Sequence, residues 1–131
     1  MHNLSSFDYA IIRVVPHVER GECINVGVIL FCRTRRFLGA LMHLNPQRLA
    51  ALAPDLDPAL VQSHLDILVQ VCKGGPDAGP IGQLSQSERF HWLVAPRSTI
   101  IQPSPVHSGL CTDPAQTLEK LFKAMVPNQY P

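Results

Sequence analysis

The sequence predicts an α+β fold, in which an antiparallel sheet carries three to four packed helices. Three runs of aromatic and β-branched residues lie close together near the N-terminus, at 7–15, 24–32 and 37–43. After residue 45 the pattern changes to helix starts, in which a capping residue precedes a proline. A chain of 131 residues has room for one core, so we expect a single α+β domain over residues 1–131.

The three N-terminal runs predict a β-meander. The first, FDYAIIRVV at 7–15, stops at Pro16, because proline cannot donate to a strand ladder. Residues 16–22 supply a turn before INVGVILFC at 24–32, and TRR at 34–36 separates that run from FLGALMH at 37–43. The middle run is apolar at nearly every position. We therefore expect both its faces to be covered, with helices on at least one side.

Four helices are indicated by their first residues. Helix starts with proline at the first position follow Asn45, Asp57 and Asp113. The second of these helices reaches about Cys72, and its apolar residues cover more than one stripe, which indicates a central core helix. Ser85 and Glu88 form a capping box that opens a short helix. The last helix should pack on the sheet through Leu118, Leu121, Phe122, Met125 and Val126.

Between the last two helices, residues 97–109 are expected to be extended. Pro103 and Pro105 exclude an α-helix there, and a strand that contains proline belongs at the edge of a sheet. We therefore expect an edge strand around residues 98–107. The chain has 12 prolines, and these two are the ones that neither a turn nor a helix start requires.

Charge and motif content exclude several function classes. The net charge is +1, which is not the footprint of a generic nucleic-acid-binding protein, and Arg33, Arg35 and Arg36 are interpreted as a solvated turn rather than a local nucleic-acid contact. The N-terminus resembles no signal peptide, and no apolar run approaches a membrane span, so we expect a cytoplasmic protein with no membrane contact. The four cysteines and six histidines show no metal-ligand spacing, so we expect no metal or cofactor, and cysteines that act as small core residues.

Arg13, Glu22 and Asn25 form the first candidate cluster. Arg13 interrupts one apolar strand and Asn25 the next, and an odd-with-odd register would place both on one face, with Glu22 near the turn. A buried charge must be paired to be tolerated, so an Arg13–Glu22 ion pair is one interpretation. A small anion-recognition site is the other.

Arg97, Ser98, Gln102 and His107 form the second candidate cluster, on the proline-stiffened segment. A rigid polar edge suits recognition of a partner strand or a small polar ligand. The alternative is that this segment is a solvent-facing edge whose prolines prevent aggregation. Ser104 lies near His107 and Asp113 in sequence, but no nucleophile motif surrounds it, so we assign no catalytic residue.

Three stretches of the chain, at 9–30, 87–109 and 113–126, resemble the bacterial domain-of-unknown-function family numbered 3037. The clearest part is a pattern formed by Tyr9, Arg13, Pro16, Gly21, Glu22, Asn25, Val26, Gly27 and Val28. A later block is similar at Arg89, Phe90, Arg97, Ser98, Gln102 and Gly109. The resemblance covers almost the whole chain. Some members look like companions of HipA-like kinase genes, which implies a partner-binding or regulatory role.

We therefore expect a small, non-catalytic binding or regulatory module that contacts a protein partner, with a HipA-like kinase as the partner that the resemblance implies. Arg13 and Arg97 would act as cationic anchors, and Asn25, Ser98 and Gln102 as hydrogen-bonding groups. The alternative is an enzyme or binder for a small phosphorylated or carboxylated ligand. In that case His107 would be the acid or base and the arginines would hold the anion.

Overall fold

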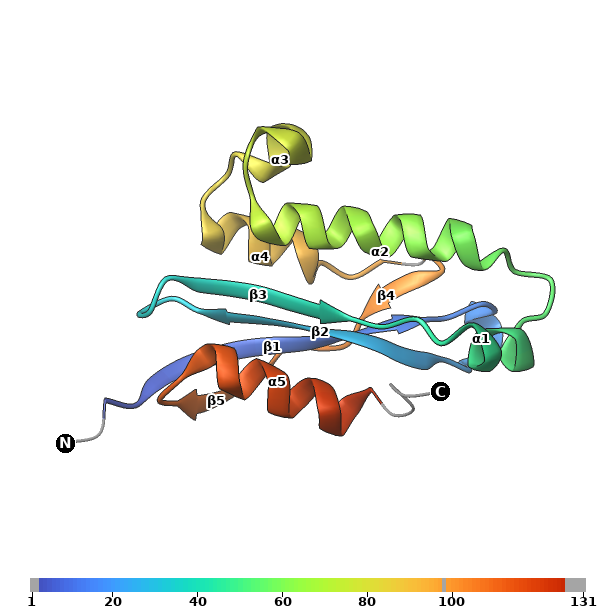
Figure 1. Cartoon of the computed structure of the whole chain (residues 1–131), viewed down its shortest axis with the longest axis horizontal. Coiled ribbons are helices and arrows are strands. Elements are labelled where there is room, and N and C mark those ends of the chain that lie inside the picture. The colour runs from blue at the N-terminus through green and yellow to red at the C-terminus, as the bar shows by residue number, and fades with distance from the viewer. Residues whose placement is uncertain (1–2, 98, 127–131) are drawn as a thin grey trace.

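The computed structural model, which describes residues 3–97 and 99–126, has a five-stranded antiparallel sheet between two layers of helices (Figure 1). The predicted α+β class is confirmed. The N-terminal meander consists of β1 (Ser5–Val14), β2 (Ile24–Cys32) and β3 (Phe37–Met42). On its other side β1 pairs with β4 (Ile101–Pro103) and β5 (His107–Cys111), so the order is β3-β2-β1-β4 with β5 also beside β1.

Five α-helices surround the sheet. Their bounds are Pro46–Leu52 for α1, Pro58–Lys73 for α2, Gly79–Gly82 for α3, Gln86–Leu93 for α4 and Pro114–Met125 for α5. Short 3₁₀ turns occur at Val18–Arg20 and Pro76–Ala78. The four predicted helix starts are confirmed, because the side chains of Asn45, Asp57, Ser85 and Asp113 each accept a hydrogen bond from a backbone N–H of the first turn.

Helices cover both faces of β2, as expected from a strand that is apolar at nearly every position. In Figure 1, α2 and α4 lie on one face of the sheet and α5 lies on the other. Ile29 and Phe31 of β2 pack in the α2-side core, whereas Val28 and Leu30 pack in the α5-side core with Leu118. Each fully buried aliphatic side chain of this kind contributes about 1.5–3 kcal/mol to stability.

A β-bulge in β2 sets which residues share a face. Ile12 pairs with Gly27, but the next residue, Arg13, pairs with Asn25, which leaves Val26 as the extra residue. Val26 thereby stays in the α2-side core. Asn25 lies on the opposite face, directly beside Arg13.

The edge strand expected around residues 98–107 is present as two short strands. Between the pairs Ile12–Pro103 and Tyr9–His107, two residues of β1 lie opposite three residues of the edge segment. The extra residue bulges where Pro105 has no N–H to donate. There the Ser104 hydroxyl accepts a hydrogen bond from the Ile11 N–H at 2.8 Å and donates one to the Pro105 carbonyl at 2.9 Å.

Arg89 closes the C-terminal end of α2. This arginine of α4 is 8% exposed, and its Nη1 donates to the carbonyls of Val71 and Cys72 at 3.2 and 3.1 Å. These carbonyls lie in the last turn of α2 and have no partner within the helix. Gly74 follows with φ +78°, and a Cβ there would lie 2.3 Å from Arg89 Nη1. The chain after α2 therefore needs glycine both for its backbone conformation and for space.

The cysteines differ in exposure. Cys32, Cys72 and Cys111 are buried, as the sequence predicts, but Cys23 is exposed, so its prediction as a core residue is wrong. Cys23 precedes β2 directly and lies outside the strand. Burial raises the pKa of the Cys72 thiol to about 12 and also raises the pKa of Cys111. In the described part of the chain, no helix has the length and apolar character needed to cross a membrane.

These differences predict selective alkylation in the native state. Iodoacetamide at mildly alkaline pH should modify Cys23 and leave Cys72 unmodified, because the raised pKa and burial of Cys72 suppress the reactive thiolate. Peptide mass spectrometry measures the sites, with denatured protein as the control in which every cysteine reacts. Modification of native Cys72 as fast as Cys23 would contradict the burial described here.

Candidate functional site

Three polar side chains form a row across the sheet at the end of β1, and we call Asn25, Arg13 and Gln102 the polar row. Arg13 pairs with Asn25 of β2 on one side and with Gln102 of β4 on the other. Residues that pair directly across strands share a face, so the three side chains lie together on the α5 side. The predicted proximity of Arg13 and Asn25 is confirmed.

The two outer members of the polar row have structural partners. Asn25 Nδ2 donates to the carbonyl of Met125 at 2.9 Å, which ties the end of α5 to the sheet. Gln102 Nε2 donates to the carbonyl of Thr99 at 2.9 Å. Arg13 differs from them, because its Nε is buried and has no hydrogen-bond partner among residues 3–97 and 99–126. A buried donor without a partner costs about 1–3 kcal/mol, so Arg13 carries unused hydrogen-bonding capacity.

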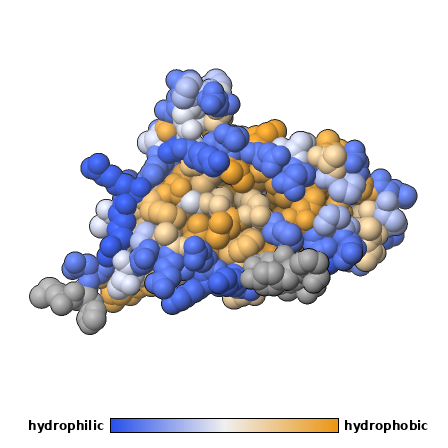
Figure 2. Space-filling view, in the orientation of Figure 1, coloured by the Kyte–Doolittle hydropathy of each residue, from blue (hydrophilic) through white to orange (hydrophobic). Residues whose placement is uncertain are grey.

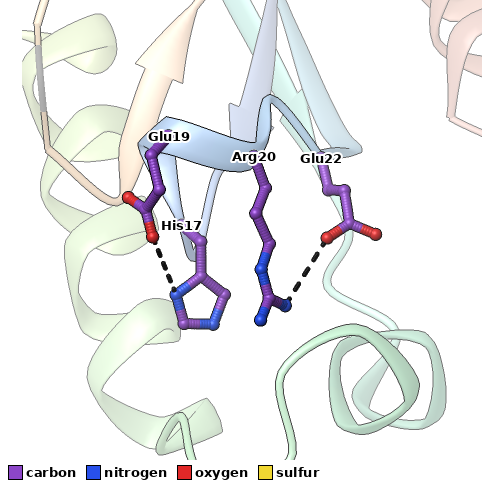
Figure 3. A network of polar contacts seen from close by, with 4 residues as sticks. All are labelled: His17, Glu19, Arg20 and Glu22. Atoms are coloured by element: carbon purple, nitrogen blue, oxygen red, sulfur yellow. Dashed lines mark ion pairs between the residues drawn. The ribbon is translucent and has the colours of Figure 1, made fainter.

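The Arg13–Glu22 ion pair, one of the two interpretations of the first cluster, does not form among the described residues. Glu22 lies 3.7 Å from Arg20 Nη1, and both side chains are more than half exposed. Figure 3 shows this pair beside a second one, between His17 Nδ1 and Glu19 at 3.8 Å, on the same loop. The 3₁₀ turn after β1 brings Arg20 within reach of Glu22, and an exposed pair of this kind contributes little to stability.

Arg97 lies on the other face of the sheet, beside α4. Its Nη2 donates to the carbonyl of Trp92 at 2.8 Å, and its guanidinium carbon stands 4.9 Å from the centre of the Trp92 ring. Partial burial lowers the pKa of Arg97 from its ordinary value. Among the described residues Arg97 has no carboxylate partner. The guanidinium stays protonated, so it is a partly buried cation without a counter-charge among the described residues.

The second predicted cluster is divided by the sheet. Gln102 joins Arg13 on the α5 side, and Arg97 stays on the α2 side. His107 of β5 is exposed and packs against Tyr9 with ring centres 5.4 Å apart. Ser98 lies outside the described residues. An enzyme that combines both arginines with His107 in one pocket does not fit this arrangement.

Ser104 has a structural role in the edge segment. It is 3% exposed, and its hydroxyl is engaged with the Ile11 N–H and the Pro105 carbonyl. A serine nucleophile needs a hydroxyl bonded to its general base and open to substrate. The Ser104 hydroxyl meets neither condition in this structure.

A groove beside Arg97 runs along α2, and we call it the Arg97 groove. Two adjoining hollows form it, the larger with a volume of about 220 Å³, and both include His64, Thr99 and Ile101. Leu60 and Ile67 of α2 form its outer wall and are 48% and 55% exposed. Trp92 and Arg97 close one end. The groove therefore combines exposed aliphatic surface, an aromatic ring and one partly buried cation.

Sequence reasoning missed most of this groove. The apolar residues of α2 cover more than one stripe, and we expected a central core helix. The buried stripe contains Val61, Leu65 and Leu68, while Leu60 and Ile67 belong to a second, exposed stripe. The sequence signal that could have revealed the groove is the second apolar stripe of α2, which is more than one face packed on the core requires.

Both arginine sites offer hydrogen-bond donors whose chemistry fits an anion. Arginine donates in a planar fork that fits a carboxylate or a phosphate, and neither Arg13 nor Arg97 has such a partner within the described chain. No group of three histidine, cysteine or acidic side chains is arranged to hold a metal ion in the described residues.

The unpaired Nε of Arg13 predicts that this residue does not stabilise the fold. Arg13→Met should leave the free energy of unfolding unchanged or raise it by about 1 kcal/mol, because the buried donor is removed while the aliphatic stem is kept. Asn25→Ala is the matched control in the polar row, and loss of its bond to Met125 should lower that free energy by about 1 kcal/mol. Urea unfolding measures both. A loss for Arg13→Met as large as that for Asn25→Ala would contradict this assignment.

Comparison with known proteins gives a family and no function. No curated protein and no solved structure matches the chain. One family, DUF3037, described as a protein of unknown function, matches residues 9–126. That range includes all of the meander after residue 8, the polar row and the Arg97 groove. The chain therefore belongs to the DUF3037 family of proteins of unknown function.

Proposed function

We propose that this protein is a non-catalytic binding or regulatory module that contacts a protein partner through the Arg97 groove. The observation that carries the proposal is the partly buried guanidinium of Arg97, which has no carboxylate partner within the described chain and lies next to exposed aliphatic surface. Binding an anionic group there would give the charge a counter-ion at a site less exposed to water than the open surface, which strengthens the attraction.

The composition of the groove favours a protein over a small molecule. Tryptophan and arginine are the residues that most often dominate the energy of protein interfaces, and both occur here in contact. Leu60 and Ile67 are seven residues apart, which spaces them by about 10 Å along α2. A groove of that length suits successive side chains of one polypeptide segment.

The expected partner segment therefore has a defined chemistry. It presents aliphatic side chains to Leu60 and Ile67, and it presents a carboxylate, from aspartate, glutamate or a chain end, to Arg97. His64 and Thr99 line the same groove and add hydrogen-bonding groups. A HipA-like kinase, the partner implied by the family resemblance, is the first protein to test.

Binding to a purified HipA-like kinase from the same organism tests this proposal. Biolayer interferometry should detect binding by the wild type. Ile67→Asp should weaken binding at least tenfold, because it places a charge where an aliphatic side chain of the partner would pack and offers Arg97 a competing carboxylate in the same groove. Arg97→Gln should weaken it as well, through loss of the cation. Ile67 is more than half exposed, so its substitution should leave the fold intact.

Leu110→Asp is the matched control, because Leu110 is an aliphatic residue of β5 that is 66% exposed and does not line the groove. It should bind like the wild type. Absence of wild-type binding, or equal binding by Ile67→Asp, would contradict the proposal. Full displacement of the kinase by inorganic phosphate or acetate would instead indicate the alternative, a site for a small anionic ligand.

A further inference from the structure

β3 forms one edge of the sheet and carries none of the devices that protect such edges. Within the described residues it pairs only with β2. Its six residues, FLGALM, include no charge and no proline, and all are half-buried. Figure 2 shows apolar surface in the middle of the view, where β3 runs in Figure 1, between hydrophilic surface over α2 and α5. A flat, uncharged edge strand of this kind is a template for another strand.

The outward backbone groups of β3 can be identified from its pairing with β2. His43 donates its N–H to the carbonyl of Val26 at 2.7 Å. Successive residues of an antiparallel strand direct their N–H and C=O groups to alternate sides, so residues 37, 39 and 41 also face β2. Leu38, Ala40 and Met42 therefore direct their N–H and C=O groups away from the sheet.

The opposite edge of the same sheet is protected. It is formed by β4 and β5, which are short and are separated by a bulge at Ser104. Pro103 and Pro105 remove two backbone donors from that segment. Proline, bulges and short strands are the usual means of preventing edge-to-edge pairing. These devices occur at one edge and are missing from β3, so β3 is the edge of this sheet that is open to pairing.

Charge favours a second copy of this chain as the occupant. The net charge is +1, so two copies repel each other little, and the uncharged strand offers nothing to select a charged partner. The turn that contains Arg33, Arg35 and Arg36 lies at the start of β3. Antiparallel pairing keeps the arginine-rich turns of two copies at opposite ends of the interface. Parallel pairing would place these positively charged turns side by side.

We infer that two copies pair through β3, antiparallel about a two-fold axis at Ala40, and join their sheets into one. Ala40, the central outward residue, then faces Ala40 of the second copy, and Leu38 faces Met42 of the second copy. This register uses all three outward residues of each strand and places the smallest side chain at the axis. The inference goes beyond the proposed function and concerns a different surface from the Arg97 groove.

Sedimentation equilibrium and amide hydrogen exchange on the wild-type protein test this inference together. The mass should approach twice the 14.5 kDa of one chain as the concentration rises. Over the same range the exchange of the Leu38, Ala40 and Met42 amides should slow, because each amide becomes hydrogen-bonded only in the dimer. A monomer at all concentrations, or a dimer in which these amides stay unprotected, would overturn the inference. Protection that requires a different protein would overturn it too.

Two sets of variants test the register. Ala40→Pro removes an outward N–H without removing a bond to β2, so it should fold, as measured by its thermal unfolding midpoint, and remain monomeric. Leu38→Glu and Met42→Lys should each be monomeric alone. Mixed together they should form a heterodimer, because one glutamate then faces one lysine across the joint. A folded Ala40→Pro dimer, or a mixture that stays monomeric, would overturn the pairing.

Discussion

The hydrogen bond from the Ile11 N–H to the Ser104 hydroxyl is the interaction on which the arrangement of the sheet depends. Ile11 is in the middle of β1, opposite the bulge where Pro105 supplies no donor and the regular ladder is interrupted. Without the serine hydroxyl the buried Ile11 N–H would lose its partner, which costs about 1–3 kcal/mol. The Ser104 N–H also donates to the Ile11 carbonyl at 2.7 Å, so a single residue satisfies both backbone groups of Ile11.

This junction makes β1 an interior strand along most of its length. β5 covers its first half and β4 its end, although the bulge between them would otherwise expose its centre. The same bulge and its prolines prevent another strand from pairing with the outer side of that segment. The two edges of the sheet therefore differ in their capacity to pair with a further strand. β3, at the other edge, keeps a regular backbone and an apolar sequence. The asymmetry between the edges is the basis for assigning self-association to β3.

The junction also determines where the arginines lie. β4 pairs with the end of β1 so that Ile101 enters the α2-side core and Gln102 lies beside Arg13 on the α5 side. Arg97 precedes β4 and remains with α4 through its hydrogen bond to Trp92. The two cations therefore serve separate surfaces. Of the two, Arg97 lines a groove with exposed aliphatic walls, and for this reason the proposed partner site is placed there.

Much of the fold could be predicted because the signals are local. The meander follows from β-branched runs and short turns, and the helices follow from capping residues before proline. The neighbours Arg13 and Asn25 follow from strand alternation. The β-bulge that brings them into register lies next to Gly27, and a glycine within a strand is a typical sign of a bulge.

The incorrect predictions concern contacts and burial that depend on how separate segments of the chain pack together. Glu22 pairs with Arg20 because a 3₁₀ turn brings them together, and sequence does not reveal that turn. The apolar pattern of α2 does not say which of its stripes faces the core, so the exposure of Leu60 and Ile67 could not be predicted from it. Arg89 has distant backbone carbonyls as partners, which only the folded chain identifies.

Amide hydrogen exchange at Ile11 tests the central role of Ser104 most directly. In the wild type the Ile11 amide should be as well protected as its neighbours in β1. In Ser104→Ala its exchange should accelerate selectively, while amides of β1 that bond to β2 remain protected. Unchanged protection of Ile11 in Ser104→Ala would mean that the Ser104 hydroxyl is not the group that protects the Ile11 N–H, and it would contradict the account.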